Sequence, residues 1–172
     1  MKKNNVILIG FMGCGKTTIG IRLSYRMRRI FEDTDKLIEK KQQREIKDIF
    51  AAEGESFFRE LETQMLSELE STVTNRVISV GGGTPIREEN REILKRLGTV
   101  CYLRIRPETV YERLKNDTTR PLLQGDNPKE KIHRLMESRK EAYESCADMI
   151  LDVDELSIEE ILENIVSEVG EE

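Results

Sequence analysis

The sequence has no tryptophan, one histidine and only three cysteines among its 172 residues. The cysteines, Cys14, Cys101 and Cys146, are odd in number, and their spacing is unlike that of a disulfide framework or a zinc site. We interpret them as reduced thiols, as expected of a protein that works in the cytoplasm. The single histidine, His133, is predicted to lie on the surface of a helix rather than to take part in catalysis.

Long hydrophobic runs and an excess of positive charge are also missing. The initial MKKNN is followed by only four apolar residues before Gly10, which is too short for a signal peptide or a membrane span. The net charge of −5 argues against nucleic acid or an anionic membrane as a general partner. No exposed heptad or long apolar patch is evident, so we expect a soluble monomer.

Short apolar runs alternate with helical patterns along the chain. Buried strands are predicted at residues 6–9, 77–80, 100–105 and 149–153, with a shorter one near 30–31. Helices are predicted between them at residues 16–28, 36–41, 46–50, 58–69, 88–97 and 129–145, and Ser157 with Glu160 forms a capping box for a last helix. This alternation is typical of a single α/β domain, residues 1–172, built on a parallel sheet.

Residues 116–128, NDTTRPLLQGDNP, do not fit this alternation. They are polar, lack periodicity, and contain a glycine and two prolines. An irregular segment of this length in a compact domain is more often a lid or a binding loop than a simple connection. We expect it to be a lid.

Residues 10–17 read GFMGCGKT and match the pattern G-x-x-x-x-G-K-[ST]. Glycines let the backbone curl so that several N–H groups converge on phosphate oxygens at a helix N-terminus. Lys16 would place a positive charge against the β- and γ-phosphates, and Thr17 would offer its hydroxyl to Mg²⁺. A strand before and a helix after favour a nucleotide-binding loop over a chance turn. The predicted nucleotide-binding residues here are Gly13, Cys14, Gly15, Lys16, Thr17 and Thr18, with the Cys14 thiol acting as a spacer.

A phosphate-binding loop does not define the reaction. A GTPase would need an Asn-Lys-x-Asp base-reading motif, which the sequence lacks. A motor or AAA-type ATPase would need a longer chain and an acidic residue at the end of a hydrophobic strand, but the run VISV ends in glycines. A small kinase remains.

Two carboxylates, Asp33 and Asp35, follow the short strand in the motif EDTD. In an extended segment, residues two apart point the same way, so both carboxylates can face an active site. One would join the Mg²⁺ shell, and the other would accept a proton from a substrate hydroxyl. The alternatives are a solvated turn or a helix N-cap.

Basic residues and glycines further along offer an acceptor site. Arg59 can clamp a carboxylate, or it can pair with glutamates at helical spacing. Gly81, Gly82 and Gly83 follow a strand and permit close approach of a ligand, or they form only a tight turn. Within the lid, Arg120 can close over the transferring phosphoryl group. Arg139, on the next helix, is the weakest of these signals, since a surface charge on the helix is the better explanation of this residue taken alone.

Taken together, the motifs resemble the shikimate kinase family. The resemblance runs from about residue 6 to about residue 148 and rests on GFMGCGKTTIG, DTDKLIE, IFAAEGESFFRELE, SVGGGTP, TRPLL and SRKEAYESCAD in this order. It implies a P-loop fold of the nucleoside-monophosphate-kinase-like class, with five parallel strands in the order 2-3-1-4-5. It also implies ATP and Mg²⁺ as co-substrate and metal, and transfer of the γ-phosphate to the 3-hydroxyl of shikimate, in the pathway to chorismate and the aromatic amino acids.

The resemblance also implies a role for each candidate residue. On the acceptor side, Asp35 would bind the ring hydroxyls, Arg59 and Arg139 would clamp the carboxylate, and Gly81, Gly82 and Gly83 would lie against the ring. On the nucleotide side, Thr17 would ligate Mg²⁺ and Asp33 would join its outer shell, while Arg113 would lie against adenine. The residues implied in catalysis are Lys16, Asp35 and Arg120.

Two other functions stay open at this point. The first is a related small-molecule kinase, such as a gluconate kinase, from which the carboxylate clamp and the paired aspartates would distinguish this chain. The second is a nucleotide-sensing module that keeps the fold without turnover. The presence of Lys16, Asp35 and Arg120 together argues against it.

Overall fold

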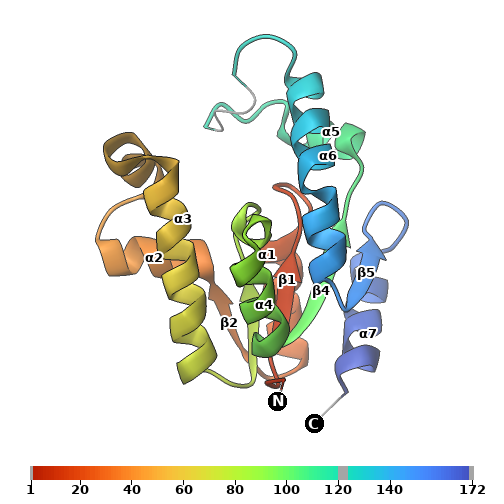
Figure 1. The fold of residues 1–172 in the computed structure, drawn as a ribbon. Helices are drawn as coiled ribbons and strands as arrows, with labels where there is room; N and C mark the ends of the chain where they lie inside the picture. Colours follow the sequence, from red (N-terminus) through yellow and green to blue (C-terminus); the bar gives the residue numbers. More distant parts are fainter. Residues whose placement is uncertain (1, 120–123, 171–172) are drawn as a thin grey trace.

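A parallel five-stranded sheet forms the centre of the computed structural model, which describes residues 2–119 and 124–170 (Figure 1). The strand order is β2-β3-β1-β4-β5, as predicted. The bounds are Val6–Ile9 for β1, Ile30–Asp33 for β2, Arg76–Ser79 for β3, Thr99–Arg104 for β4 and Met149–Asp152 for β5. Each side chain of β1 is completely buried, as its unbroken apolar run predicts for a central strand covered on both faces.

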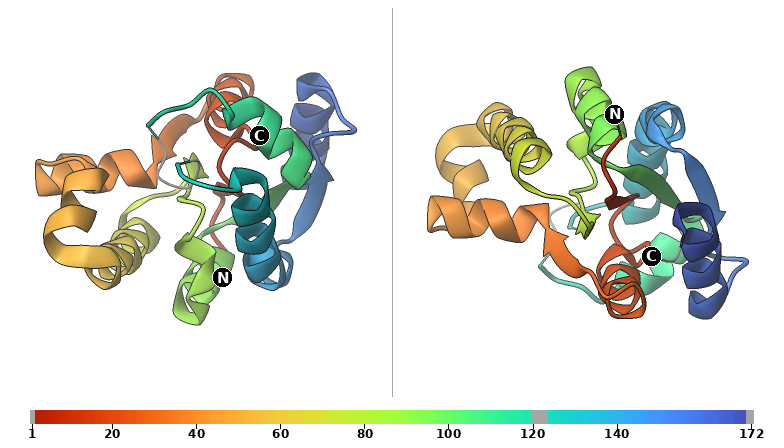
Figure 2. Two further views of the ribbon diagram at one scale, coloured as in Figure 1. Left: turned by 90° about the horizontal axis from the view of Figure 1, so that it is seen from above. Right: turned by 90° about the horizontal axis from the view of Figure 1, so that it is seen from below.

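Helices cover both faces of the sheet (Figure 2). The pair α1 (Lys16–Arg26) and α7 (Ile158–Val169) lies on one face, and the pair α4 (Glu88–Leu97) and α6 (Pro128–Cys146) lies on the other. The remaining helices are α2 (Thr34–Gln42) and α3 (Ile46–Thr72), which lie beyond the β2 edge, the short 3-10 helix η1 (Thr84–Ile86), and α5 (Pro107–Leu114). None of the helices in the described part of the chain is long and apolar enough to cross a membrane.

Most predicted elements agree with the structure to within one or two residues. Ser157 and Glu160 form the predicted capping box at the start of α7. The two helices predicted around residues 46–50 and 58–69 are the two halves of α3, which breaks at Gly54 (φ 83°, ψ 175°). No sequence pattern predicted η1, which follows the glycine triplet directly.

Asn5, which is 1% exposed, directly precedes β1 and connects β3 to the end of α4, at the end of the sheet opposite the phosphate loop. Its Nδ2 donates to the Leu97 carbonyl (2.7 Å), and its Oδ1 accepts from the Arg76 N–H (2.8 Å). We expect Asn5→Ala to lower the free energy of unfolding by about 2–4 kcal/mol, because two buried backbone groups would lose their partners. Urea unfolding measures this change.

Asn164→Ala provides the matched control. Asn164 is exposed, and within the described part of the chain its amide donates only to the Glu160 carbonyl of the same helix. We expect this change to stay within about 0.5 kcal/mol. Equal losses in the two variants would contradict the role given to Asn5.

Candidate active site

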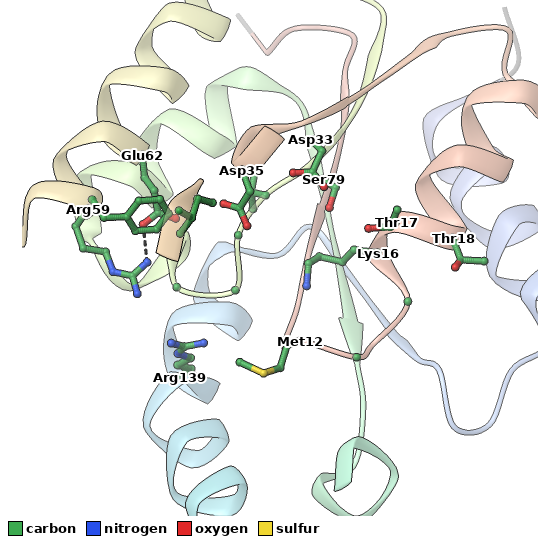
Figure 3. A pocket seen from close by; sticks show the side chains of 18 residues that line it. Met12, Lys16, Thr17, Thr18, Asp33, Asp35, Arg59, Glu62, Ser79 and Arg139 are labelled. Atoms are coloured by element: carbon green, nitrogen blue, oxygen red, sulfur yellow. Dashed lines mark hydrogen bonds and ion pairs between the residues drawn. The ribbon is translucent and has the colours of Figure 1, made fainter. Parts of the chain in front are cut away.

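A cavity of about 450 Å³ opens at the carboxyl ends of the central strands, where ligands of open α/β sheets bind (Figure 3). Its wall comes from the loop between β1 and α1, the start of α2, the second half of α3, the residues after β3, and α6. In the view of Figure 3, Arg59 and Arg139 lie at one end, Lys16 and Thr17 lie at the other, and Asp35 lies between. The cavity therefore has a cationic end, a phosphate-loop end and an acidic centre.

The phosphate loop has the conformation that its sequence predicts. Gly15 adopts the left-handed φ of 100° that only glycine adopts freely, and α1 begins at the next residue. The Nζ of Lys16 donates to the carbonyls of Gly10 (2.6 Å) and Phe11 (3.3 Å). Five of the six predicted nucleotide-binding residues line the cavity, namely Gly13, Gly15, Lys16, Thr17 and Thr18.

Cys14 is the exception among these loop residues. Its side chain is only 1% exposed, and its backbone N–H donates to the Phe11 carbonyl (3.1 Å). The thiol is therefore part of the core beneath the loop, which agrees with its interpretation as a spacer.

The residues that line the cavity fit a magnesium nucleotide. Thr17 and Asp33 both face it, and hydroxyl and carboxylate oxygens are the donors that Mg²⁺ prefers. No group of three histidine, cysteine, aspartate or glutamate side chains within residues 2–119 and 124–170 could hold a metal ion. A cation at this place would therefore need phosphate oxygens among its ligands, as in phosphate-loop kinases.

The paired aspartates do not share an extended segment, so this part of the prediction is wrong. The strand β2 ends at Asp33, and α2 begins at Thr34, which places Asp35 in the first helical turn. Asp33 is the N-cap of α2, and its Oδ1 accepts the Lys36 N–H (3.2 Å), because an aspartate here satisfies an N–H that the helix leaves unpaired. Both carboxylates nevertheless line the cavity.

Asp35 lies in an unfavourable place for a charged group. Its Oδ1 is buried and has no hydrogen-bond partner among the described residues. Burial, followed by the charges of Asp33 and Glu62, raises the pKa of Asp35 from its ordinary value of 3.8 to about 6, although Lys16 opposes the shift. A buried carboxylate without a partner is typical of a group that binds or deprotonates a ligand.

Each residue of the glycine triplet lies against a charged side chain. A Cβ on Gly81 would be 2.9 Å from Oδ1 of Asp35, and one on Gly82 would be 3.3 Å from Nη1 of Arg139. A Cβ on Gly83 would overlap the guanidinium of Arg59. The triplet therefore lets both arginines approach the backbone closely, and it is more than a tight turn.

Arg59 forms the helical ion pairs that the sequence offered as the alternative to a carboxylate clamp, and it also lines the cavity. Its Nη1 pairs with Oε1 of Glu62 (2.6 Å) and its Nη2 with Oε1 of Glu55 (3.2 Å), so the helical ion pairs are present. The side chain is nevertheless only 16% exposed and lines the cavity beside Gly83. Glu55 and Glu62 orient the guanidinium in the wall of the cavity.

Arg139 is buried, so its alternative interpretation as a surface charge is wrong. The residue is 9% exposed, and its guanidinium lies 5.6 Å from the centre of the Phe11 ring. Its Nε has no hydrogen-bond partner, and no carboxylate of the described residues forms an ion pair with it. A buried cation of this kind is well suited to receive an anionic ligand.

Arg113, another predicted residue, does not line the cavity. The Nη1 of Arg113 donates to the Gly13 carbonyl (2.8 Å), so this arginine contacts the phosphate loop from outside. Arg120 lies outside the described residues. Of the predicted lid, residues 116–119 and 124–127 form no helix or strand, and α6 begins at Pro128.

Glu62 is the main functional candidate that the sequence analysis missed. It is 2% exposed and lines the cavity between Arg59 and Asp35. Its position three residues after Arg59 was a usable signal, but that spacing indicates a surface ion pair as readily as a buried one. Met12, Phe58 and Ser79 also line the cavity; each lies within one of the quoted motifs, but none was predicted as a site residue.

All three cysteines are buried and free. Burial raises the pKa of the Cys101 thiol to about 12 and that of Cys146 to about 11, so both stay protonated at neutral pH. We expect a chromogenic disulfide reagent to modify less than one thiol per chain within minutes in the folded protein, and three after denaturation. Rapid modification of two or more thiols in the folded protein would contradict this burial.

Comparison with known proteins agrees with this geometry. The family model for shikimate kinase matches residues 12–170. A shikimate kinase from Thermodesulfovibrio yellowstonii is 42% identical over 164 residues, which cover 95% of this chain and 94% of the relative. The solved structure of a shikimate kinase from Acinetobacter baumannii in complex with shikimate matches with a TM-score of 0.88 at 36% identity, over 98% of this chain and 93% of that chain.

A more distant structure bears on the fold alone. A deoxyadenosine kinase from M. mycoides matches with a TM-score of 0.59 at 17% identity, over 96% of this chain and 98% of that chain. Its likeness, together with the sheet order, confirms the predicted nucleoside-monophosphate-kinase-like class of P-loop fold.

Proposed function

The chain belongs to the shikimate kinase family, and we propose that its cavity holds shikimate at the cationic end and the phosphates of ATP at the phosphate loop. The reaction is ATP-dependent phosphorylation of shikimate, with transfer to the 3-hydroxyl. The observation that carries the proposal is the convergence of two guanidiniums and one unpartnered carboxylate on a glycine triplet beside the phosphate loop.

Arg59 and Arg139 bind the carboxylate of shikimate in this proposal. Arg139 has no carboxylate partner among the described residues, so the substrate supplies the missing charge. Arg59 keeps N–H donors to spare, since its pairs with Glu55 and Glu62 use two of five. A substrate without a carboxylate is rejected because the buried Arg139 charge would stay unpaired.

Asp35 binds the 3-hydroxyl at the other side of the ring and accepts its proton during transfer. The oxygen then forms a bond to the γ-phosphorus, the bond from that phosphorus to the bridging oxygen of ADP breaks, and ADP leaves with the bond electrons. The raised pKa of Asp35, about 6, suits a group that must take up a proton near neutral pH. Gly81, Gly82 and Gly83 allow the ring to lie close to the backbone.

Lys16 compensates the charge of the β- and γ-phosphates, and N–H groups at the start of α1 direct partial positive charge toward them. Mg²⁺, when bound, neutralises phosphate charge and helps to align the γ-phosphoryl group. Thr17 is its proposed ligand through Oγ1, and Asp33 its proposed outer-shell partner. Positioning and charge stabilisation provide most of the rate enhancement, as is usual in phosphoryl transfer.

The remaining expectations are part of the same proposal. Arg113 contacts adenine, and Arg120, in the predicted lid, approaches the phosphoryl group while closure excludes water. Residues 1–172 act as one domain and as a monomer, without nucleic acid or membrane partners. Three free buried cysteines favour the reducing cytoplasm as the compartment.

A coupled assay of ADP release tests the function directly. We expect ADP production from ATP and Mg²⁺ to depend on shikimate, with gluconate giving no increase above the background without acceptor. Turnover with gluconate but not shikimate would indicate a related sugar-acid kinase. Binding of ATP without any acceptor-dependent ADP release would indicate a nucleotide-sensing module instead.

A further inference from the structure

We propose that Thr84 is a positioning residue for the acceptor site, because its hydroxyl holds Glu62 in the orientation that leaves Arg59 free to bind the substrate carboxylate. Thr84 is the first residue of η1 and directly follows the glycine triplet. The inference rests on the proposed function, since it concerns how the carboxylate clamp is held in place.

The two oxygens of the Glu62 carboxylate have different partners. Oε1 accepts from Nη1 of Arg59 at 2.6 Å, and Oε2 accepts from the hydroxyl of Thr84. Glu62 is 2% exposed and Thr84 is 1% exposed, so water cannot readily replace either contact. The charge of Glu62 is therefore shared between one arginine and one hydroxyl.

This division matters for Arg59. A carboxylate with both oxygens free would turn to bind the guanidinium through two parallel N–H groups, which is the preferred geometry of such pairs. Because the hydroxyl of Thr84 engages Oε2, Glu62 takes only one N–H of Arg59. Glu55 takes one N–H of Nη2, and the remaining donors stay available on the guanidinium, which lines the cavity beside Gly83.

Thr84 is itself held from two directions. Its backbone N–H donates to the Gly81 carbonyl (3.0 Å), and its carbonyl accepts from Nδ2 of Asn90 (2.9 Å). Asn90 is completely buried in α4, and its Oδ1 accepts from the hydroxyl of Thr63, one turn after Arg59 on α3. This network fixes η1 between α3 and α4, so the position of the hydroxyl is set by the fold.

The kinetics of two Thr84 variants test the proposal. We expect Thr84→Val, which keeps the shape and removes the donor, to raise KM for shikimate about tenfold, since a hydrogen bond to a buried charge is lost. The value of kcat should stay within about twofold, because a carboxylate clamp remote from the transferred group holds ground state and transition state equally. KM for ATP should not change, and Thr84→Ser should restore KM for shikimate to within about twofold.

Thr109→Val is the matched control. The hydroxyl of Thr109 also donates to a carboxylate, that of Asp154, but it lies on α5 outside the cavity. We expect Thr109→Val to leave KM for shikimate unchanged. If Thr84→Val does not fold, Thr84→Ala removes the same donor without any new bulk and should raise KM for shikimate equally.

An unchanged KM for shikimate in both Thr84→Val and Thr84→Ala would overturn the proposal. So would a Thr84→Ser variant as impaired as Thr84→Val, since the effect would then come from packing. In an Arg59→Lys background, the further increase caused by Thr84→Val should disappear; a full further increase would mean that Thr84 does not act through Arg59. Failure of the proposed function itself is distinguishable, because the unmodified protein would then show no shikimate-dependent ADP release.

Discussion

Arg139→Ala should lower kcat/KM for shikimate by about a hundredfold or more, because a buried cation that pairs with the substrate carboxylate is lost. The free protein should be at least as stable as before. Arg139 is buried with an unpartnered Nε and no ion pair to a carboxylate of the described residues, so its removal relieves a desolvated charge. Steady-state kinetics and thermal unfolding together measure the two effects.

Arg59→Ala should impair catalysis in the same direction but should also destabilise the free protein. Glu62, at 2% exposed, would lose its cationic partner and remain as a buried charge. Arg59 and Arg139 are both proposed to bind the substrate carboxylate, so their variants should have similar kinetics. The two variants should nevertheless differ in the stability of the ligand-free protein. Thermal unfolding without ligands separates them.

Arg134→Ala is the matched control on the same helix as Arg139. Its side chain is 79% exposed, and among the described residues it pairs only with Glu130 across one helical turn. We expect neither kcat/KM nor the unfolding temperature to change appreciably. An Arg139→Ala variant with the kinetics of Arg134→Ala would show that Arg139 does not bind the substrate.

Asp35→Asn should lower kcat roughly a thousandfold, the usual contribution of a positioned acid–base group, while it stabilises the free protein at neutral pH. The stabilisation follows from the burial of Oδ1 without a partner and from the neighbouring charges of Asp33 and Glu62. An amide of the same shape avoids the cost of burying the charge. Coupled ADP release gives kcat, and thermal unfolding in EDTA gives stability without divalent cations.

The gain in stability should depend on pH. The folded protein raises the pKa of Asp35 from 3.8 to about 6, so the protonated form is favoured on folding. The stabilising effect of this proton is fully present at pH values below the pKa of Asp35 in the unfolded protein. It is lost as pH rises through the pKa of Asp35 in the folded protein. Asp35→Asn should therefore be the more stable protein at about pH 7–8, and the two proteins should converge near about pH 4.

Asp48→Asn is the control for this pair of measurements. Asp48 is exposed in the first turn of α3 and lies outside the cavity. It should leave kcat unchanged and should slightly lower stability, because a carboxylate favours a helix N-terminus. Full activity in Asp35→Asn would refute the role of Asp35 as proton acceptor.

The sequence predicted the fold well because each element carried its own signal. The unbroken apolar run of β1 and the alternation of strands with helices required a parallel sheet covered on both faces. The order of the strands came from the family resemblance and not from these patterns. Gly54 and η1 show the limit, because a single left-handed residue or one short helical turn carries too little periodicity to detect.

The sequence predicted which residues form the candidate site, but it did not predict how deeply they are buried or which side chains they contact. Burial of Arg139 depends on packing between segments far apart in the chain. The helical position of Asp35 follows from the N-cap at Asp33, which the sequence left open as an alternative. Arg59 shows why the alternatives could not be separated: the spacing of its glutamates is the same whether the ion pair is exposed or forms the wall of a cavity. The contact between Thr84 and Glu62 joins residues 22 positions apart and left no local pattern.

The central claim is that the two arginines recognise the carboxylate of the acceptor. The most direct measurement compares kcat/KM for shikimate with that for its neutral carboxamide, in the unmodified protein and in Arg139→Ala. We expect the unmodified protein to prefer shikimate by about a hundredfold or more, and Arg139→Ala to lose most of this preference. Equal kcat/KM for the two acceptors in the unmodified protein would contradict the account.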